Sequence, residues 1–171
     1  EMVAEDPYCL SNDFYGIGFF SADKVALSIG LELDSHQRIF AAIKHVLSAS
    51  REHGHCYLTE QQINKSVSEL IELNVDNILS ELLKQMEVDN QLRVRLLISE
   101  GDESKCYYSK TLYYDEDTVA NILKTMSDNV EIDESRISNW ISLYCSQQSI
   151  SLSDEQSESV VGVVQHRFSI L

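Results

Sequence analysis

The sequence predicts a mainly α-helical chain that contains one small β-hairpin. Over most of its 171 residues, apolar side chains recur at the i, i+3, i+4 and i+7 spacing of one helical face. Between residues 92 and 109 this period changes to an apolar and polar alternation, which is typical of strands. Pro7 is the only proline, and no Gly/Ser-rich linker interrupts the chain. A compact, helix-rich fold is therefore expected.

Four helices are expected before the hairpin. Their predicted ranges are residues 21–29, from 34 or 35 to about 54, 59–71 and 76–86. Gly30 ends the first helix, and either Asp34 or Ser35 can cap the second. Thr59 begins the third with a Thr-Glu-Gln-Gln sequence, which resembles a capping box closed by Gln62.

The hairpin is expected to consist of a strand over residues 92–98, a turn over 99–104 and a returning strand over 105–109. A short apolar piece at 55–58 lies where winged-helix domains often place a first small strand. A further helix is predicted over about 113–126, with Val119, Ile122 and Leu123 inside. Helices followed by a β-hairpin are the order of a winged-helix domain.

Charge and composition exclude several classes of protein. No apolar run reaches the roughly 18 residues that would suggest a membrane span, and the first residues do not resemble a signal peptide. We therefore expect a cytoplasmic protein without membrane contact. The net charge is −15, although residues 11–60 carry four basic against six acidic side chains and are nearly neutral. Residues 101–150 carry four against nine, which predicts a solvated acidic surface.

The cysteines and histidines do not predict a metal site. Four cysteines lie far apart without a C-x-x-C pair, which favours free thiols in a reducing compartment. His53 and His55 lie close to Cys56, but no second cluster completes a set of metal ligands.

A glycine-containing segment, Phe14-Tyr15-Gly16-Ile17-Gly18-Phe19, precedes the first predicted helix. This Gly-x-Gly turn is a signature of a helix-hairpin-helix, in which backbone N–H groups at a helix N-terminus approach a phosphate closely. The candidate DNA-backbone-binding residues are Gly16, Ile17, Gly18, Phe19 and Lys24. The alternative is a tight turn in which the glycines serve packing only, and the scarcity of Lys and Arg nearby favours that alternative.

A second segment begins at Leu152. Ser153 can cap a helix, with Gln156 closing the capping box. The apolar end at residues 168–171 has the pattern of a buried strand that enters a larger sheet.

Taken in order, several short sequences resemble the region that precedes the motor in RecD-like helicases, the stand-alone relatives of the exodeoxyribonuclease V alpha subunit. They are Pro7-Tyr8-x-Leu10, Gly16-Ile17-Gly18-Phe19, Ala22-Asp23, Arg38-Ile39, Gly54-His55-x-Tyr57-Leu58 and Leu152-Ser153-x-Glu155-Gln156. Single motifs are weakly specific, whereas the ordered set spans most of the chain. Ser159 stands where the family usually has Ala.

The resemblance implies a domain order. Residues 1–33 would form the helix-hairpin-helix, 34–128 a winged-helix-like helical domain, 129–150 a linking helix, and 151–171 the first helix and strand of a RecA-like α/β motor domain that stops before the phosphate-binding loop. Gln156 would contact the adenine of ATP in the full-length protein. ATP and Mg²⁺ would be cofactors of that protein but not of this fragment, which has no catalytic residues.

The resemblance also implies the function: a non-catalytic, DNA-contacting and scaffolding region of an ATP-dependent superfamily-one DNA helicase in repair or recombination. Single-stranded DNA, weakly bound, would be one partner, and the motor domains would be an intramolecular one. The alternative is a winged-helix protein-interaction module without DNA binding, which the charge of −15 suits better. A winged-helix transcription regulator is disfavoured, because residues 76–87 carry only Lys84 against three acidic side chains.

Overall fold

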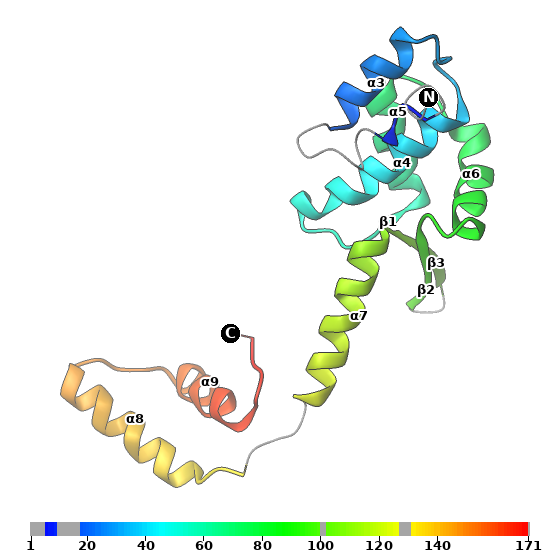
Figure 1. Cartoon of the computed structure of the whole chain (residues 1–171). Coiled ribbons are helices and arrows are strands. Elements are labelled where there is room, and N and C mark those ends of the chain that lie inside the picture. The colour runs from blue at the N-terminus through cyan, green and yellow to red at the C-terminus, as the bar shows by residue number, and fades with distance from the viewer. Residues whose placement is uncertain (1–5, 10–17, 100–101, 127–130, 171) are drawn as a thin grey trace. The chain divides into compact units, whose positions relative to one another are not determined.

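The computed structural model describes residues 6–9, 18–99, 102–126 and 131–170 (Figure 1). In chain order the elements are α3 (Phe19–Ser28), α4 (His36–Ala49), η1 (Ser50–His53), β1 (Leu58–Thr59), α5 (Glu60–Ile71), α6 (Asp76–Val88), β2 (Arg93–Ser99), β3 (Asp102–Tyr108), α7 (Lys110–Thr125), α8 (Glu134–Gln148) and α9 (Asp154–Gln165). The chain divides into two units, residues 1–116 and 117–171, and α7 crosses the boundary. The mainly helical fold class with one small sheet is confirmed.

Local capping determines where several helices begin. The hydroxyl of Ser35 accepts a hydrogen bond from the backbone N–H of Arg38 and so caps α4. Thr59 and Gln62 form the predicted reciprocal capping box at α5, which stabilises two otherwise unpaired N–H groups. The helix α3 begins at Phe19, two residues before the predicted start.

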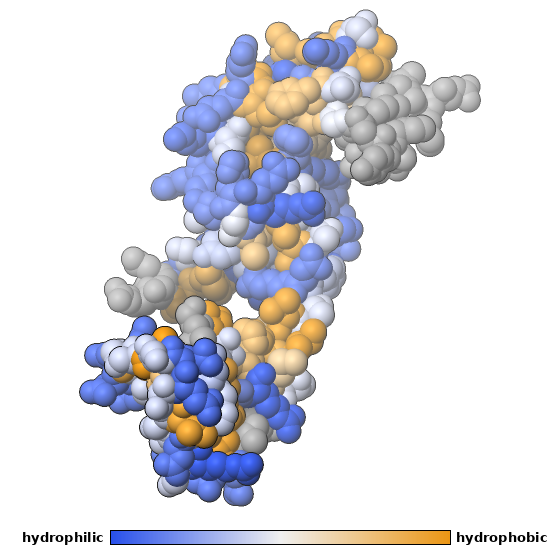
Figure 2. Space-filling model, turned by 90° about the vertical axis from the view of Figure 1, so that its left-hand side faces the viewer, coloured by the Kyte–Doolittle hydropathy of each residue, from blue (hydrophilic) through white to orange (hydrophobic). Residues whose placement is uncertain are grey.

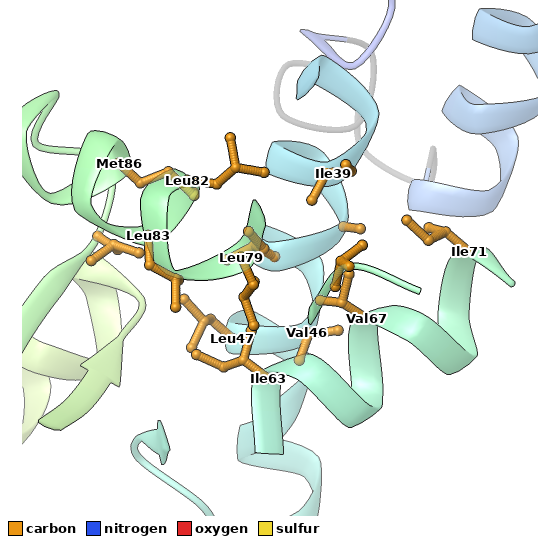
Figure 3. Packing of buried hydrophobic residues seen from close by; sticks show 14 of the residues in the cluster. Ile39, Val46, Leu47, Ile63, Val67, Ile71, Leu79, Leu82, Leu83 and Met86 are labelled. Atoms are coloured by element: carbon orange, nitrogen blue, oxygen red, sulfur yellow. The ribbon is translucent and has the colours of Figure 1, made fainter. Parts of the chain in front are cut away.

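The first unit has one hydrophobic core between its helices (Figure 3). Its most completely buried aliphatic side chains come from α4, α5 and α6: Ile39, Ile43, Leu47, Ile63, Val67, Leu79, Leu82, Leu83 and Met86. In α3 the buried residues are Phe19, Ala22 and Ala26, whereas Val25 and Ile29, which share the i, i+3, i+4 and i+7 spacing with the two alanines, are exposed. The small side chains of Ala22 and Ala26 allow α3 to lie close to α4.

The three strands form an antiparallel sheet in the order β1-β3-β2. The predicted six-residue turn at 99–104 is wrong, because Ser99 pairs with Asp102 and only two residues separate the strands. Polar residues can continue β3 here because pairing with β2 satisfies their backbone groups without burying their side chains. Leu96 and Ile98 are 58% and 73% exposed, so this part of the hairpin extends beyond the core.

The second unit contains α8 and α9, which pack against each other. Among its described residues, Ile141 is the one buried hydrophobic side chain. The expectation that Val119 and Ile122 lie inside is wrong: they are 55% and 48% exposed. Figure 2 shows hydrophobic surface among the polar residues of the α8–α9 part, which faces the viewer. The unit therefore leaves much apolar surface uncovered.

The predicted strand at residues 168–171 is not observed over its described part. Residues 168–170 adopt no strand, and Phe168 and Ile170 are 48% and 86% exposed. A strand needs a neighbouring strand to pair its backbone groups, and the described part of this unit holds no sheet that could accept it.

Candidate nucleic-acid interface

Gly18 stands at the N-cap of α3. Its carbonyl accepts hydrogen bonds from the N–H groups of Ser21 and Ala22, at 3.1 and 3.2 Å. Its φ of −84° and ψ of 174° are open to any residue. A Cβ built there meets no atom within 4 Å in the part of the chain that the structure describes. Among the described residues, neither the backbone conformation nor contact with an added Cβ requires glycine at this position.

The other candidate residues near Gly18 have different places. Gly16 and Ile17 lie outside the described residues. The side chain of Phe19 is buried, and its ring stacks against Tyr8 and His45 at centroid distances of 6.0 and 5.3 Å. Only the backbone N–H of Phe19 can therefore serve a ligand. Lys24 is exposed on α3.

A cavity of about 350 Å³ lies beside Gly18 and along α4. Besides Gly18 it is lined by Asp6, Tyr8, Phe19, Gln37, Phe40, Ala41, Lys44, His45, Ser48 and Gln91. Sequence reasoning did not single out the polar side of α4. In the sequence, this polar face is indicated by the spacing of Gln37, Lys44 and Ser48. They recur seven and four residues apart, on the face opposite the buried residues of α4.

Arg38, which belongs to one of the short sequences that resemble RecD-like helicases, is not available to a ligand. Its guanidinium is buried and forms a bidentate pair with Asp23, with Nε donating to Oδ1 at 2.9 Å and Nη2 to Oδ2 at 3.0 Å. Nη1 donates to the backbone carbonyls of Leu33 and Ile71. The hydroxyl of Tyr8 also donates to Asp23, at 2.6 Å. This network joins the N-terminal segment, α3, α4 and the end of α5.

The network changes the pKa of each member. Burial and the hydrogen bond to Asp23 raise the pKa of Tyr8. Burial alone would raise the pKa of Asp23, but hydrogen bonds from Arg38 and Tyr8, together with the charge of Arg38, hold it below its ordinary value. The hydrogen bonds to Asp23 outweigh burial and raise the pKa of Arg38. The charged pair therefore persists over the whole physiological pH range and positions α3.

Two further arginines contact tyrosines at the sheet. The guanidinium of Arg93 lies 5.6 Å from the ring centre of Tyr114 and donates to its hydroxyl at 2.8 Å. Arg95 lies 4.3 Å from the ring centre of Tyr113 and 3.8 Å from Glu116. These contacts attach α7 to the sheet and give both arginines a structural role.

Gln156 lies in the first turn of α9. Its side-chain carbonyl accepts a hydrogen bond from the N–H of Ser153 at 3.0 Å, and the Ser153 hydroxyl accepts from the N–H of Gln156. The predicted capping box is confirmed. The structure thus gives Gln156 a local role in starting the helix.

In the described part of the chain, no group of three His, Cys, Asp or Glu side chains could bind a metal ion. Among the same residues, no helix has both the length and the hydrophobicity to span a membrane.

Comparison with known families identifies the part of the chain that carries Gly18 and α4. Residues 1–57 match the family model described as the ATP-dependent RecD2 DNA helicase HHH domain. Gly18, Lys24 and all the residues that line the α4 cavity except Gln91 fall within this range. This match supports a RecD2-type N-terminal helix-hairpin-helix region over the first 57 residues.

Proposed function

We propose that this chain is a non-catalytic, DNA-contacting and scaffolding region of an ATP-dependent superfamily-one DNA helicase, similar to exodeoxyribonuclease V alpha and acting in repair or recombination. The match of residues 1–57 to the RecD2 helix-hairpin-helix carries the proposal. The open first turn of α3 at Gly18 supports it, because backbone N–H groups at a helix N-terminus bind phosphates without reading base sequence.

Within this proposal, residues 34–128 form the winged-helix-like domain, after a helix-hairpin-helix at 1–33. The order α4, β1, α5, α6, β2, β3 supports it, as does the pairing of β1 with β3. In a DNA-reading winged helix, α6 would enter the groove. It carries Asp76, Glu81 and Glu87 against Lys84, so we assign it a scaffolding role.

Residues 129–150 would link this domain to a motor domain that starts at 151–171. The exposed Trp140, Leu143, Val164 and Phe168 support this assignment, because uncovered apolar side chains of this size are normally buried against a partner. In the full-length protein ATP and Mg²⁺ would bind the motor, with Gln156 near the adenine. The 171 residues contain no Gly-x-x-x-x-Gly-Lys-Ser/Thr sequence to bind phosphates, so no step of ATP chemistry is assigned to them.

We expect the chain to bind single-stranded DNA weakly and with a steep dependence on salt. Each cation that meets a phosphate of a single strand contributes a slope of about −0.7 to log K against log salt. Anisotropy of a labelled single strand at about 20 mM and about 200 mM salt measures this slope. Tight binding that does not change with salt would contradict backbone recognition.

Gly18→Val is expected to weaken that binding without unfolding the chain. An added Cβ meets no described atom within 4 Å, so the branched side chain is expected to obstruct the approach of a ligand to the first turn of α3. Gly162→Val is the matched control, because a Cβ at that position in α9 is equally free of described neighbours. Equal DNA affinities of the two variants, after circular dichroism confirms their helicity, would remove Gly18 from the interface.

The second candidate function is a winged-helix protein-interaction module. The net charge of −15 and the acidic surface of α6 favour it. It predicts no DNA binding at any salt concentration, so the anisotropy experiment also separates the two functions.

A further inference from the structure

The positive charge of this acidic chain is concentrated in one stretch. Residues 36–66 carry four Lys and Arg against two Asp and Glu, in a chain with a net charge of −15. One of the four, Arg38, is buried in its pair with Asp23, so Lys44, Arg51 and Lys65 are the basic side chains left to meet a ligand. Four of the five histidines also lie there. This stretch forms α4, η1, β1 and the first half of α5.

A second cavity, of about 340 Å³, lies where α4, η1 and α5 meet. Its polar lining includes His45, His53, His55 and Lys65, and no carboxylate occurs among the described residues that line it. Gly54 has a φ of 78°, in the left-handed region that favours glycine, and this turn lets the histidines on both sides line the same cavity.

His45 lines both the second cavity and the one beside Gly18. The two cavities are therefore neighbours along α4. We define the α4 strip as the side chains of Lys44, His45, Ser48, His53, His55 and Lys65, each of which lines at least one cavity.

We propose that the α4 strip is a second binding segment for the sugar–phosphate backbone of DNA, continuing from the first turn of α3. This inference rests on the proposed function and extends it beyond the glycine turn. Ammonium, imidazole and hydroxyl groups are the donors that phosphate oxygens accept. A surface with excess positive charge on an otherwise acidic chain would also select where a polyanion lies.

The charged groups around the strip come from several elements. Burial lowers the pKa of His45, and the nearby Glu52 opposes this only in part. Glu52 and Arg51, both exposed on η1, have opposite charges. Lys65 adds a positive charge from α5.

Two further carboxylates lie near the strip. Asp6 lines the cavity beside Gly18 together with Lys44 and His45. Glu60, at the start of α5, accepts a hydrogen bond from Tyr107 at 3.3 Å, and this contact directs it to the sheet. The cavity with His53, His55 and Lys65 is therefore the part of the strip that has no carboxylate in its described lining.

The test measures single-strand DNA affinity of the whole chain against salt. Each cation that meets a phosphate contributes about −0.7 to the slope, so Lys65→Gln should make the slope shallower by about 0.7. The variant H53Q/H55Q removes two imidazole groups of the strip and should lower the affinity. His166→Gln is the matched control, a histidine of the other unit, and should behave as the unaltered chain.

The outcomes separate this inference from the function on which it rests. If the chain binds DNA in a manner that depends on Gly18, but Lys65→Gln and H53Q/H55Q bind with the affinity and salt slope of the unaltered chain, the strip is refuted and the proposed function stands. If no DNA binds at any salt concentration, the proposed function fails and the strip fails with it.

Discussion

Replacing Arg38 by alanine is expected to lower the free energy of unfolding by about 3 kcal/mol. The change leaves the carboxylate of Asp23 without its bidentate partner, in a place where only 13% of that side chain is exposed. It also removes the donors to the carbonyls of Leu33 and Ile71. Urea unfolding followed by circular dichroism measures the difference.

Two further variants test the cause of this effect. The double variant Arg38→Met and Asp23→Leu removes both charges, so it should be more stable than Arg38→Ala, because no charge remains buried without a partner. Tyr8→Phe removes only the hydroxyl that donates to Asp23, and we expect a loss of about 1 kcal/mol. Equal stabilities of Arg38→Ala and the unaltered chain would show that the pair contributes nothing.

The same pair predicts how stability depends on pH. Because the folded-state pKa of Asp23 lies below its unfolded value, its contribution is fully present above the ordinary aspartate pKa of about 4. It is lost as the pH falls through the folded-state value. In Arg38→Ala this part of the acid-induced loss should be smaller, which unfolding curves between pH 7 and pH 2 can measure.

Leu83→Ala is expected to cost about 3 kcal/mol, within the range for a buried leucine. Leu83 has no exposed surface and packs in the core that α4, α5 and α6 share (Figure 3). The truncation removes hydrophobic contacts and leaves a cavity. Val88→Ala on the same helix is the control, because Val88 is 84% exposed and its loss should change stability by less than about 0.5 kcal/mol. A similar effect of both variants would show that α6 does not pack as described.

Interactions that span three or four residues could be predicted from the sequence. The capping boxes of Thr59 with Gln62 and of Ser153 with Gln156 form as expected, because their partners are adjacent on one helical turn. The hairpin of β2 and β3 also follows from alternation, although its turn is shorter than predicted. The Gly-x-Gly segment was interpreted from the sequence as part of a helix-hairpin-helix, and residues 1–57, which contain it, match the RecD2 helix-hairpin-helix model.

Contacts between distant residues could not be predicted in this way. Arg38 has the charge and the hydrogen-bond donors of a residue that contacts phosphate. Only the packing of α3 against α4 brings Asp23, 15 residues earlier in the chain, beside it. The polar side of α4 becomes part of a candidate interface because His45 borders two cavities made with other elements. Val119 and Ile122 have the spacing of inward residues, yet they are exposed, since periodicity defines an apolar face without supplying a partner for it. The sequence by itself determined the capping boxes that start α5 and α9 and the strand period of the hairpin, because these depend on neighbouring residues. Only the tertiary structure decided which charged side chains are paired in the interior and which remain to meet a ligand, because burial depends on segments far apart in the chain.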